Sequence, residues 1–363
     1  MNISKRQVFA LLVLEMTGAG FVIIPKLALT LAWVDGLTSI IMATAIACFY
    51  CIGILKLSEL YEGKALFDIC DCVLGTFPTA ILRCGFVIKS TLFCGLCLGI
   101  LAHSITRVIE GELSPLWVMI TFILLVFYGC IKGREVRGRM GEVFLIPFLA
   151  VLLLVITVGL RDTEGFKELL PLLTEDGGNI ITGGVSVFMW FYPLEYVLVS
   201  MPYINNSDNL DKVCCKAVLL SGGVIALVFT MTLMRFGASQ MAGLDYPVLE
   251  MMYTVSLPFS FLERLEGFML GIWLVGMFFT LNGGLYHSGV CVSELLKGTS
   301  LNIAFFMLAL GSVAVALITK DISRITSYLI SFMLLSESIY LIVLPLVLCL
   351  RGLWEDRKNE DFN

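Results

Sequence analysis

The predicted fold depends above all on one stretch near the N-terminus, Met16-Thr17-Gly18-Ala19-Gly20, which Pro25 follows. It lies in the middle of the first apolar segment of the chain, at residues 7–31. A glycine weakens a helix by about 1 kcal/mol relative to alanine, and a proline removes a backbone hydrogen bond from the preceding turn. We therefore expect the first helix to be interrupted here.

The sixth apolar segment carries a matching anomaly. Gly183-Gly184-Val185-Ser186 lies near its start, and Phe191-Tyr192-Pro193 interrupts it before Glu195. The two interrupted segments are five segments apart. Because five is an odd number, the sixth segment enters the membrane from the side opposite to the first. The sequence thus predicts a five-plus-five inverted repeat, in which the interrupted helices 1 and 6 form a binding site near the membrane midplane.

Composition places the whole chain in a membrane. Of its 363 residues, 58% are hydrophobic and only 15% are charged, against roughly 25% charged residues in soluble domains. A spanning helix needs about 20 apolar residues. We predict an all-α integral membrane protein with transmembrane helices at 7–31, 36–57, 84–106, 115–131, 142–160, 180–200, 213–235, 264–288, 301–319 and 325–350, ten in all.

These helices predict a single polytopic membrane domain over residues 1–363. Repeat one covers about 7–160, repeat two covers about 180–350, and a short cytoplasmic tail follows at 351–363. The apolar segment at the N-terminus lacks a small-residue cleavage site, so we expect it to be retained as the first span.

The distribution of charge predicts the orientation. If the N-terminus is inside, Lys and Arg on the inner segments outnumber those on the outer segments about two to one, which favours both termini in the cytoplasm. The net charge is -5, and the basic residues are scattered through short loops. This pattern argues against nucleic acid as a partner.

An interrupted helix exposes backbone groups that a small ligand can satisfy. The N–H groups near Phe21 would face a carboxylate, and the carbonyls around Thr17 and Phe188 would accept hydrogen bonds from an ammonium group. An α-amino acid carries both groups. The candidate ligand-binding residues are therefore Thr17, Gly18, Ala19, Gly20, Phe188, Phe191, Tyr192 and Glu195.

Two alternatives stay open at these positions. The glycines would also serve simply to let helices pack closely. Glu195 either orients the half-helix or contacts the ligand, or else it is an interfacial carboxylate near the cytoplasmic end of its helix.

Other polar residues inside the spans need an explanation, because charges in lipid are costly and usually face the interior of a bundle. Glu15, Lys89 and Glu337 are such residues, and the lone His103 and His287 would be candidates for proton relays. The twelve cysteines lie mostly in apolar stretches and fit packing roles. We find no convergent nucleophile and base and no set of metal ligands, so we expect no enzyme activity, metal or cofactor.

Three stretches resemble one known family. They are Ser4-Lys5-Arg6-Gln7 leading into the glycine motif, residues 188–202 with Glu195, and Leu257-Pro258-Phe259-Ser260-Phe261-Leu262-Glu263-Arg264-Leu265-Glu266 ahead of a span with Trp273. Together they resemble the bacterial spore-germination permeases, the B subunits of nutrient germinant receptors, within the amino acid-polyamine-organocation superfamily.

This resemblance implies a fold of the leucine-transporter type in the inner membrane of the spore. It also implies A and C subunits as partners and a nutrient, such as an amino acid, whose binding triggers germination. The ligand contacts of the superfamily would fall on Thr17 to Gly20 and Phe188 to Tyr192, although Pro193 stands where relatives often have a small flexible residue. The same interrupted helices would also serve the alternative function, a proton- or sodium-coupled amino acid transporter.

Overall fold

A computed structural model describes residues 2–108, 113–159, 177–205, 209–254, 265–319 and 322–360. Within these ranges the chain is helical apart from short connections and one isolated β-bridge between Ile3 and Ile204. The elements are α1 (Lys5–Ala32), η1 (Trp33–Asp35), α2 (Gly36–Leu60), α3 (Leu66–Leu74), α4 (Thr76–Val108), α5 (Pro115–Ile131), α6 (Gly133–Gly159), α7 (Gly177–Phe188), η3 (Met189–Phe191), α8 (Pro193–Ser200), η4 (Met201–Tyr203), α9 (Leu210–Gly243), α10 (Pro247–Thr254), α11 (Leu265–Leu295), α12 (Leu301–Ile318), α13 (Ile322–Glu337), the π-helix η6 (Ser338–Val343) and α14 (Leu344–Glu360).

Helices occupy all ten predicted segments, and most of these helices are apolar enough to cross a bilayer. By length and composition, seven described stretches meet that requirement, or eight with the bent pair α7–α8 counted as one span. The first stretch, Lys5–Leu60, combines α1 and α2, and α5 is a shorter apolar helix. The fold class is confirmed as all-helical and membrane-spanning, whereas ten crossings stay a prediction.

Helix α1 is continuous, so the predicted interruption of helix 1 is wrong. It runs through Gly18, Gly20 and Pro25 without a break. A glycine costs a helix about 1 kcal/mol, whereas unpaired backbone groups in an apolar surrounding cost several kcal/mol each. Most of α1 is buried, so the unbroken helix has the lower free energy.

The predicted interruption of helix 6 is confirmed. Helix α7 ends at Phe188, one 3₁₀ turn follows, and Pro193 begins α8, with a bend of 40° between the two halves. Proline suits the first turn of a helix because that turn has no partner for its N–H group. The bend therefore follows directly from the position of Pro193 in the sequence.

A second irregular helix follows Glu337. Six residues of π-helix, Ser338–Val343, separate α13 from α14. Such segments frequently occur at functional sites because they disturb the regular hydrogen bonding of the backbone. Pro345, two residues beyond this segment, lacks an N–H group and therefore removes one of the backbone hydrogen bonds of the regular helix.

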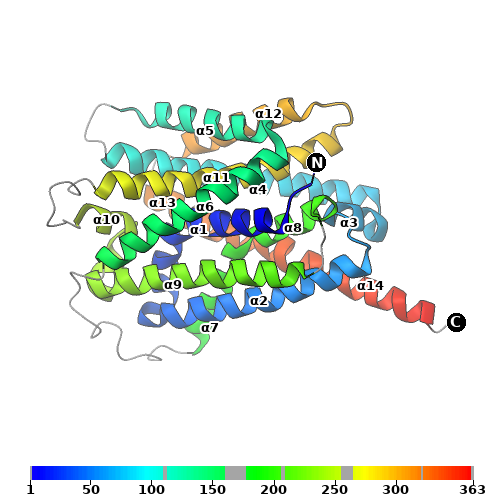
Figure 1. Ribbon diagram of the computed structural model, residues 1–363, viewed down its shortest axis with the longest axis horizontal. Helices are drawn as coiled ribbons and strands as arrows, with labels where there is room; N and C mark the ends of the chain where they lie inside the picture. The colour runs from blue at the N-terminus through cyan, green and yellow to red at the C-terminus, as the bar shows by residue number, and fades with distance from the viewer. Residues whose placement is uncertain are drawn as a thin grey trace.

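The helices run side by side along the length of the molecule, with α1 at the centre (Figure 1). Helix α1 packs against α9, α11, α6 and α7. Both termini lie at the same end of the bundle, the right-hand end in Figure 1. That both termini face the cytoplasm stays a prediction.

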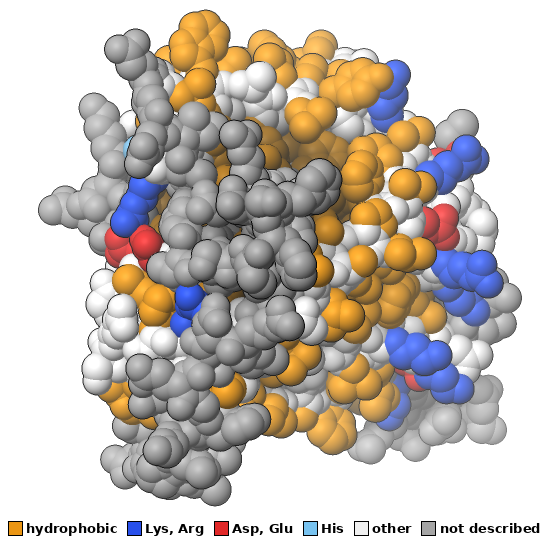
Figure 2. Space-filling view, turned by 60° about the vertical axis from the view of Figure 1, so that its left-hand side comes forward, with side chains coloured by type: hydrophobic (Ala, Val, Ile, Leu, Met, Phe, Trp, Pro, Cys, Tyr) orange, Lys and Arg blue, Asp and Glu red, His pale blue; other side chains and the backbone are white. Residues whose placement is uncertain are grey.

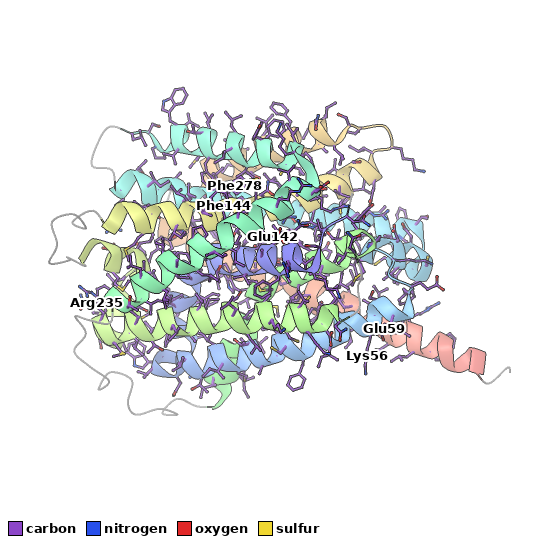
Figure 3. The ribbon with its side chains drawn as sticks, in the orientation of Figure 1. Lys56, Glu59, Glu142, Phe144, Arg235 and Phe278 are labelled. Atoms are coloured by element: carbon purple, nitrogen blue, oxygen red, sulfur yellow. The ribbon has the colours of Figure 1, made fainter. Side chains whose placement is uncertain are left out.

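The surface has the pattern of a membrane protein. Hydrophobic side chains cover the middle of the molecule, and Lys and Arg side chains gather at one edge (Figure 2). Figure 3 shows Lys56 and Glu59 at the end that holds the termini, while Arg235 lies toward the opposite end. Charged groups at both ends of an apolar band are typical of a bundle that crosses a bilayer.

Helix α1 and the bent pair α7–α8 run in opposite directions. The start of α1 meets the end of the pair at the bridge between Ile3 and Ile204. A methyl group on Gly183, in α7, would lie 3.3 Å from Ala32 Cβ at the end of α1. This antiparallel arrangement agrees with an inverted relation of the two segments, and the division into two repeats stays a prediction.

Candidate functional site

Three charged side chains from distant parts of the sequence meet beside the bend of helix 6. Lys89 Nζ, on α4, lies 2.6 and 2.8 Å from the two carboxylate oxygens of Glu195 on α8. It also lies 2.7 Å from Glu337 Oε2, at the end of α13. All three side chains are buried, with exposed fractions of 4% for Lys89 and 0% for both glutamates. We call Lys89, Glu195 and Glu337 the charged triad.

Aromatic rings surround the ammonium group of the triad. Lys89 Nζ lies 5.3 Å from the ring centre of Phe86 and 5.0 Å from that of Tyr340. Tyr340 is held in place because its hydroxyl donates a hydrogen bond to the Leu82 carbonyl oxygen, at 2.8 Å. Ring faces attract a cation, so carboxylates and rings together stabilise the buried charge of Lys89.

Local irregularities of the helices place both carboxylates of the triad. Glu195 lies in the first turn of α8, directly after the bend at Pro193, where the helix dipole favours a negative charge. Glu337 is the last residue of α13 before the π-helical segment. Broken helix 6 and the π-helix thus direct their acids toward the same lysine.

A second buried ion pair joins α1 to α6. Arg137 Nη2 donates to Glu15 Oε1, with exposed side-chain fractions of 4% and 2%. Arg137 also lies 5.5 Å from the ring centre of Tyr286. Glu15 was recognised from the sequence as a charge inside a span. Arg137 lies between the predicted spans 115–131 and 142–160, so this pair was not predicted.

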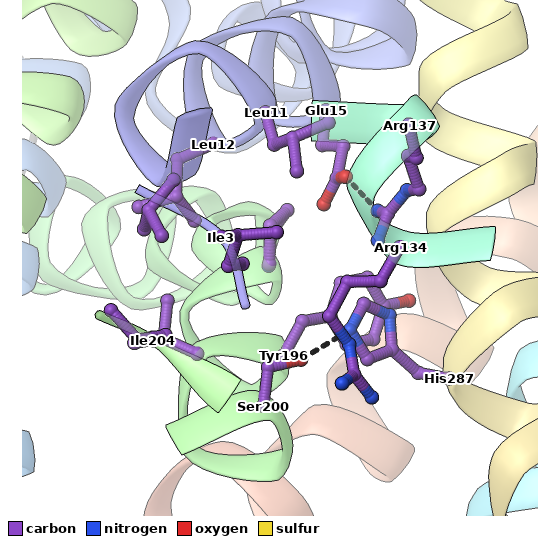
Figure 4. Close-up of a pocket in the computed structure, with 13 residues that line it drawn as sticks. Ile3, Leu11, Leu12, Glu15, Arg134, Arg137, Tyr196, Ser200, Ile204 and His287 are labelled. Atoms are coloured by element: carbon purple, nitrogen blue, oxygen red, sulfur yellow. Dashed lines mark hydrogen bonds and ion pairs between the residues drawn. The ribbon is translucent and has the colours of Figure 1, made fainter. Parts of the chain in front are cut away.

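A small cavity adjoins the Glu15–Arg137 pair (Figure 4). On its far side Ser200 and His287 Nε2 are 3.0 Å apart, and His287 Nδ1 lies 2.8 Å from the Gly283 carbonyl oxygen. The cavity holds about 30 Å³, enough for one or two water molecules. It is too small for an amino acid.

The N-terminal segment closes the bundle beside this cavity. The Ile3 N–H donates to the Tyr203 carbonyl oxygen, and the Asn205 N–H donates to the Ile3 carbonyl oxygen, each at 2.9 Å. Asn2 Nδ2 donates to Asn205 Oδ1 at 2.8 Å. The guanidinium of Arg134 lies 3.5 Å from the ring centre of Tyr203. Opening this end therefore requires residues 2–4 to separate from residues 203–205.

The candidate residues on the glycine motif face other helices. The Thr17 hydroxyl donates to the Val13 carbonyl oxygen at 2.5 Å, within α1, and Ala19 is buried. Gly18 faces Gly276 of α11, where a methyl group on Gly276 would lie 2.7 Å from Gly18 Cα. The alternative interpretation, close packing of helices, therefore explains Gly18.

The candidate residues near the bend of helix 6 lie among aromatic rings. Phe188 contacts Tyr50 edge to face, with ring centres 5.8 Å apart. Tyr192 contacts Phe93 at 4.9 Å and Tyr196 at 5.6 Å. Phe191 is fully buried. These residues surround the bend, and a ligand contact that they share with the glycine motif stays a prediction.

The structure decides between the two interpretations of Glu195. This side chain has no exposed surface and is paired with Lys89, so it is not an interfacial carboxylate. Residues 161–176 and 257–264 lie outside the described residues. Among the residues that are described, no group of three His, Cys, Asp or Glu side chains forms a metal site.

The contact between α1 and α11 leads to a testable difference between two glycines. We expect Gly18→Ala to destabilise the protein by about 1–3 kcal/mol, the usual effect of overpacking, because its methyl group would collide with the backbone of α11. Gly20→Ala is the matched control. A methyl group there would lie 3.1 Å from Ile24 Cδ1 and 3.6 Å from Ile225 Cδ1, both flexible side-chain ends.

The measurement is the melting temperature of the purified variants in detergent. Gly18→Ala should melt at a lower temperature than Gly20→Ala. Equal melting temperatures would contradict the close contact between α1 and α11.

The long apolar helices and the broken helix 6 define a multi-pass, all-helical membrane protein. Its fold is similar to that of a Na⁺-coupled sialic acid symporter, solved in a substrate-bound outward-open state, with a TM-score of 0.65. The match covers 92% of this chain and 78% of the symporter at 9% identity. It supports the predicted leucine-transporter type of fold.

The chain belongs to the spore germination protein family, whose pattern matches residues 2–325. Among curated relatives from Bacillus subtilis (strain 168), it is 23% identical to spore germination protein YndE, over 85% of each chain. It is 22% identical to spore germination protein KB, over 99% of this chain and 96% of that protein. The family resemblance noted in the sequence is thereby confirmed.

Proposed function

We propose that this chain is the nutrient-binding membrane subunit of a spore germinant receptor, with an amino acid as its ligand. The observation that carries this proposal is the family match over residues 2–325. The role is binding and signalling, not catalysis. Receptor A and C subunits are the proposed partners, and the spore inner membrane, with both termini in the cytoplasm, is the proposed location.

The chemistry beside helix 6 fits a ligand with both charges of an amino acid. Lys89 offers an ammonium group, and Glu195 offers a carboxylate at the bend. When a zwitterion binds between Lys89 and Glu195, its carboxylate pairs with Lys89 and its ammonium group pairs with Glu195. The buried site therefore gains no net charge. Burying an unpaired charge is far more costly than exchanging partners within a pair.

The burial of the charged triad indicates what binding requires. Its three side chains are 4%, 0% and 0% exposed, so the helices must move before a ligand reaches them. The binding energy of the ligand can then shift the protein toward the opened state. A change of this kind is what a receptor subunit needs in order to signal to its partners.

A second candidate function is proton- or sodium-coupled transport of amino acids. The observation in its favour is the fold, which is similar to that of a Na⁺-coupled symporter. The two functions differ in one measurable respect, because a transporter moves its substrate across the membrane whereas a receptor subunit only binds it.

The test uses spores that carry the receptor with its A and C subunits. We expect spores with the intact chain to germinate in response to at least one amino acid. Spores in which Glu195 is changed to Gln should need at least about tenfold more of it, the effect of losing about 1.4 kcal/mol of binding energy. Glu142→Gln, a change at a partly buried residue hydrogen-bonded to Gln7, is the matched control.

Two results would contradict the proposal. One is an unchanged dose-response in spores lacking the chain. The other is counterflow of a labelled amino acid by the purified chain in proteoliposomes, which would favour the transporter instead.

A further inference from the structure

The charged triad has an excess of one negative charge if both of its glutamates are ionised. Lys89 is the one cation, and it is shared between Glu195 and Glu337. The exposed fractions of the three side chains are 4%, 0% and 0%, so water does not screen the excess. An unpaired charge buried in this way is strongly unfavourable, and something must neutralise it.

Hydrogen bonding identifies the oxygen at which the excess charge lies. Lys89 donates to both carboxylate oxygens of Glu195 and to Oε2 of Glu337. Glu337 Oε1 is buried and has no hydrogen-bond partner among the described residues. Of the four carboxylate oxygens in the triad, it is the one left without a donor.

Neighbouring titratable groups do not supply the missing positive charge. Side chains from five elements lie within electrostatic range of Glu195 or Glu337, and these are Tyr50 on α2, Lys89 on α4, Tyr192 beside α8, Tyr196 on α8, Cys291 on α11 and Tyr340 on η6. Apart from Lys89, all of them are phenols or thiols, which are neutral when protonated.

The nearby basic residues are engaged elsewhere. Arg137 is paired with Glu15. His287 stacks on Tyr196, with ring centres 4.3 Å apart. Its Nδ1 faces a carbonyl oxygen, which can only accept, so Nδ1 carries the hydrogen and Nε2 can accept from the Ser200 hydroxyl. A neutral imidazole satisfies both contacts.

The remaining candidates are a proton and a metal cation. A metal cation needs several oxygen ligands, and Glu337 Oε1 has no hydrogen-bond partner among the described residues. The triad does not line the cavity beside Glu15 either, so a hydrated ion does not reach it from there. A proton needs neither space nor further ligands.

We propose that Glu195 and Glu337 together hold one proton in this closed state, carried on Glu337, so that the triad is a proton-binding site. Lys89, ionised Glu195 and protonated Glu337 then have no net charge. When the helices separate and water reaches Glu337, the carboxylate is solvated and the carboxyl group releases its proton to water. This deepens the proposed function, because it adds a proton to the resting state of the receptor.

The test is infrared spectroscopy of the purified full-length chain, without nutrient, at neutral pH. A protonated carboxylic acid has a carbonyl band separate from that of carboxylates, and exposed acids are ionised at this pH. We expect the intact chain to show this band, with a shift in heavy water. The band should disappear in Glu337→Gln and also in Glu195→Gln, because either change leaves a neutral pair with Lys89.

Lys89→Met should strengthen the band instead of removing it. Without the cation, both glutamates need a proton, so the band per molecule should double. Asp35→Asn, which alters another fully buried acid, and Glu15→Gln are the controls, and neither should remove the band. The intact chain alone already provides a test, even if a variant fails to fold.

Three results would overturn the proposal. They are the absence of the band in the intact chain, a band that survives both Glu337→Gln and Glu195→Gln, and a band that appears only after sodium and potassium are replaced by a large organic cation. The last result would assign a metal ion to the site. Because no nutrient is present, none of these results decides whether the chain is a receptor subunit, which the germination experiment tests separately.

Discussion

Lys89→Met should destabilise the protein by about 3–5 kcal/mol, the cost of removing one partner from a buried ion pair. The reason is that Glu195 and Glu337 both lose their donor while staying fully buried. Each carboxylate must then either keep an unpaired charge or take up a proton. We expect a melting temperature in detergent far below that of the unchanged chain and a smaller amount of protein in the membrane.

Two further variants make this prediction specific. Lys132→Met removes an exposed lysine that lies over the ring of Tyr128, and it should change stability by less than about 1 kcal/mol. Lys89→Met combined with Glu195→Gln leaves one acid instead of two, so it should recover a large part of the loss. A double variant that is less stable than Lys89→Met would show that the lost charge pairing is not the cause.

Arg137→Met should have an effect of similar size, about 3–5 kcal/mol. Arg137 and Glu15 are both buried, so the change leaves the carboxylate of Glu15 without a partner in the centre of the bundle. The neighbouring Arg139 provides a matched control, because it forms an exposed pair with Glu135 on the same helix. Exposed pairs contribute about 0–1 kcal/mol, so Arg139→Met should be nearly neutral.

Thermal unfolding of the two purified arginine variants, side by side, checks this difference. Adding Glu15→Gln to Arg137→Met should restore stability, because it removes the charge left unpaired. Equal losses in Arg137→Met and Arg139→Met would contradict the buried pair between α1 and α6.

The two buried ion networks also show where prediction from this sequence stopped. Glu15, Lys89, Glu195 and Glu337 were each recognised as costly charges inside apolar segments, but they were not paired with one another. Lys89 is 106 residues from Glu195 and 248 residues from Glu337. Arg137 was placed in a loop because it lies in a charged run, and its burial depends on how α6 crosses α1.

The sequence by itself determined the features that depend on local chemistry. Apolar segments long enough to span a bilayer mark the helices, and Pro193 breaks helix 6 because it lacks an N–H group. The three stretches that resemble the family could be recognised because each of them is continuous in the chain. Local signals of this kind act over a few residues and need no knowledge of the fold.

Only the tertiary structure decided what depends on neighbours from other helices. The glycine motif predicted an interruption of helix 1, but Gly18 packs against Gly276, and the surrounding helices keep α1 continuous. The charged triad likewise exists only once α4, α8 and α13 are packed together. The physical reason is that the free energy of a buried charge or a close backbone contact depends on the opposing surface, which adjacent residues in the sequence do not specify.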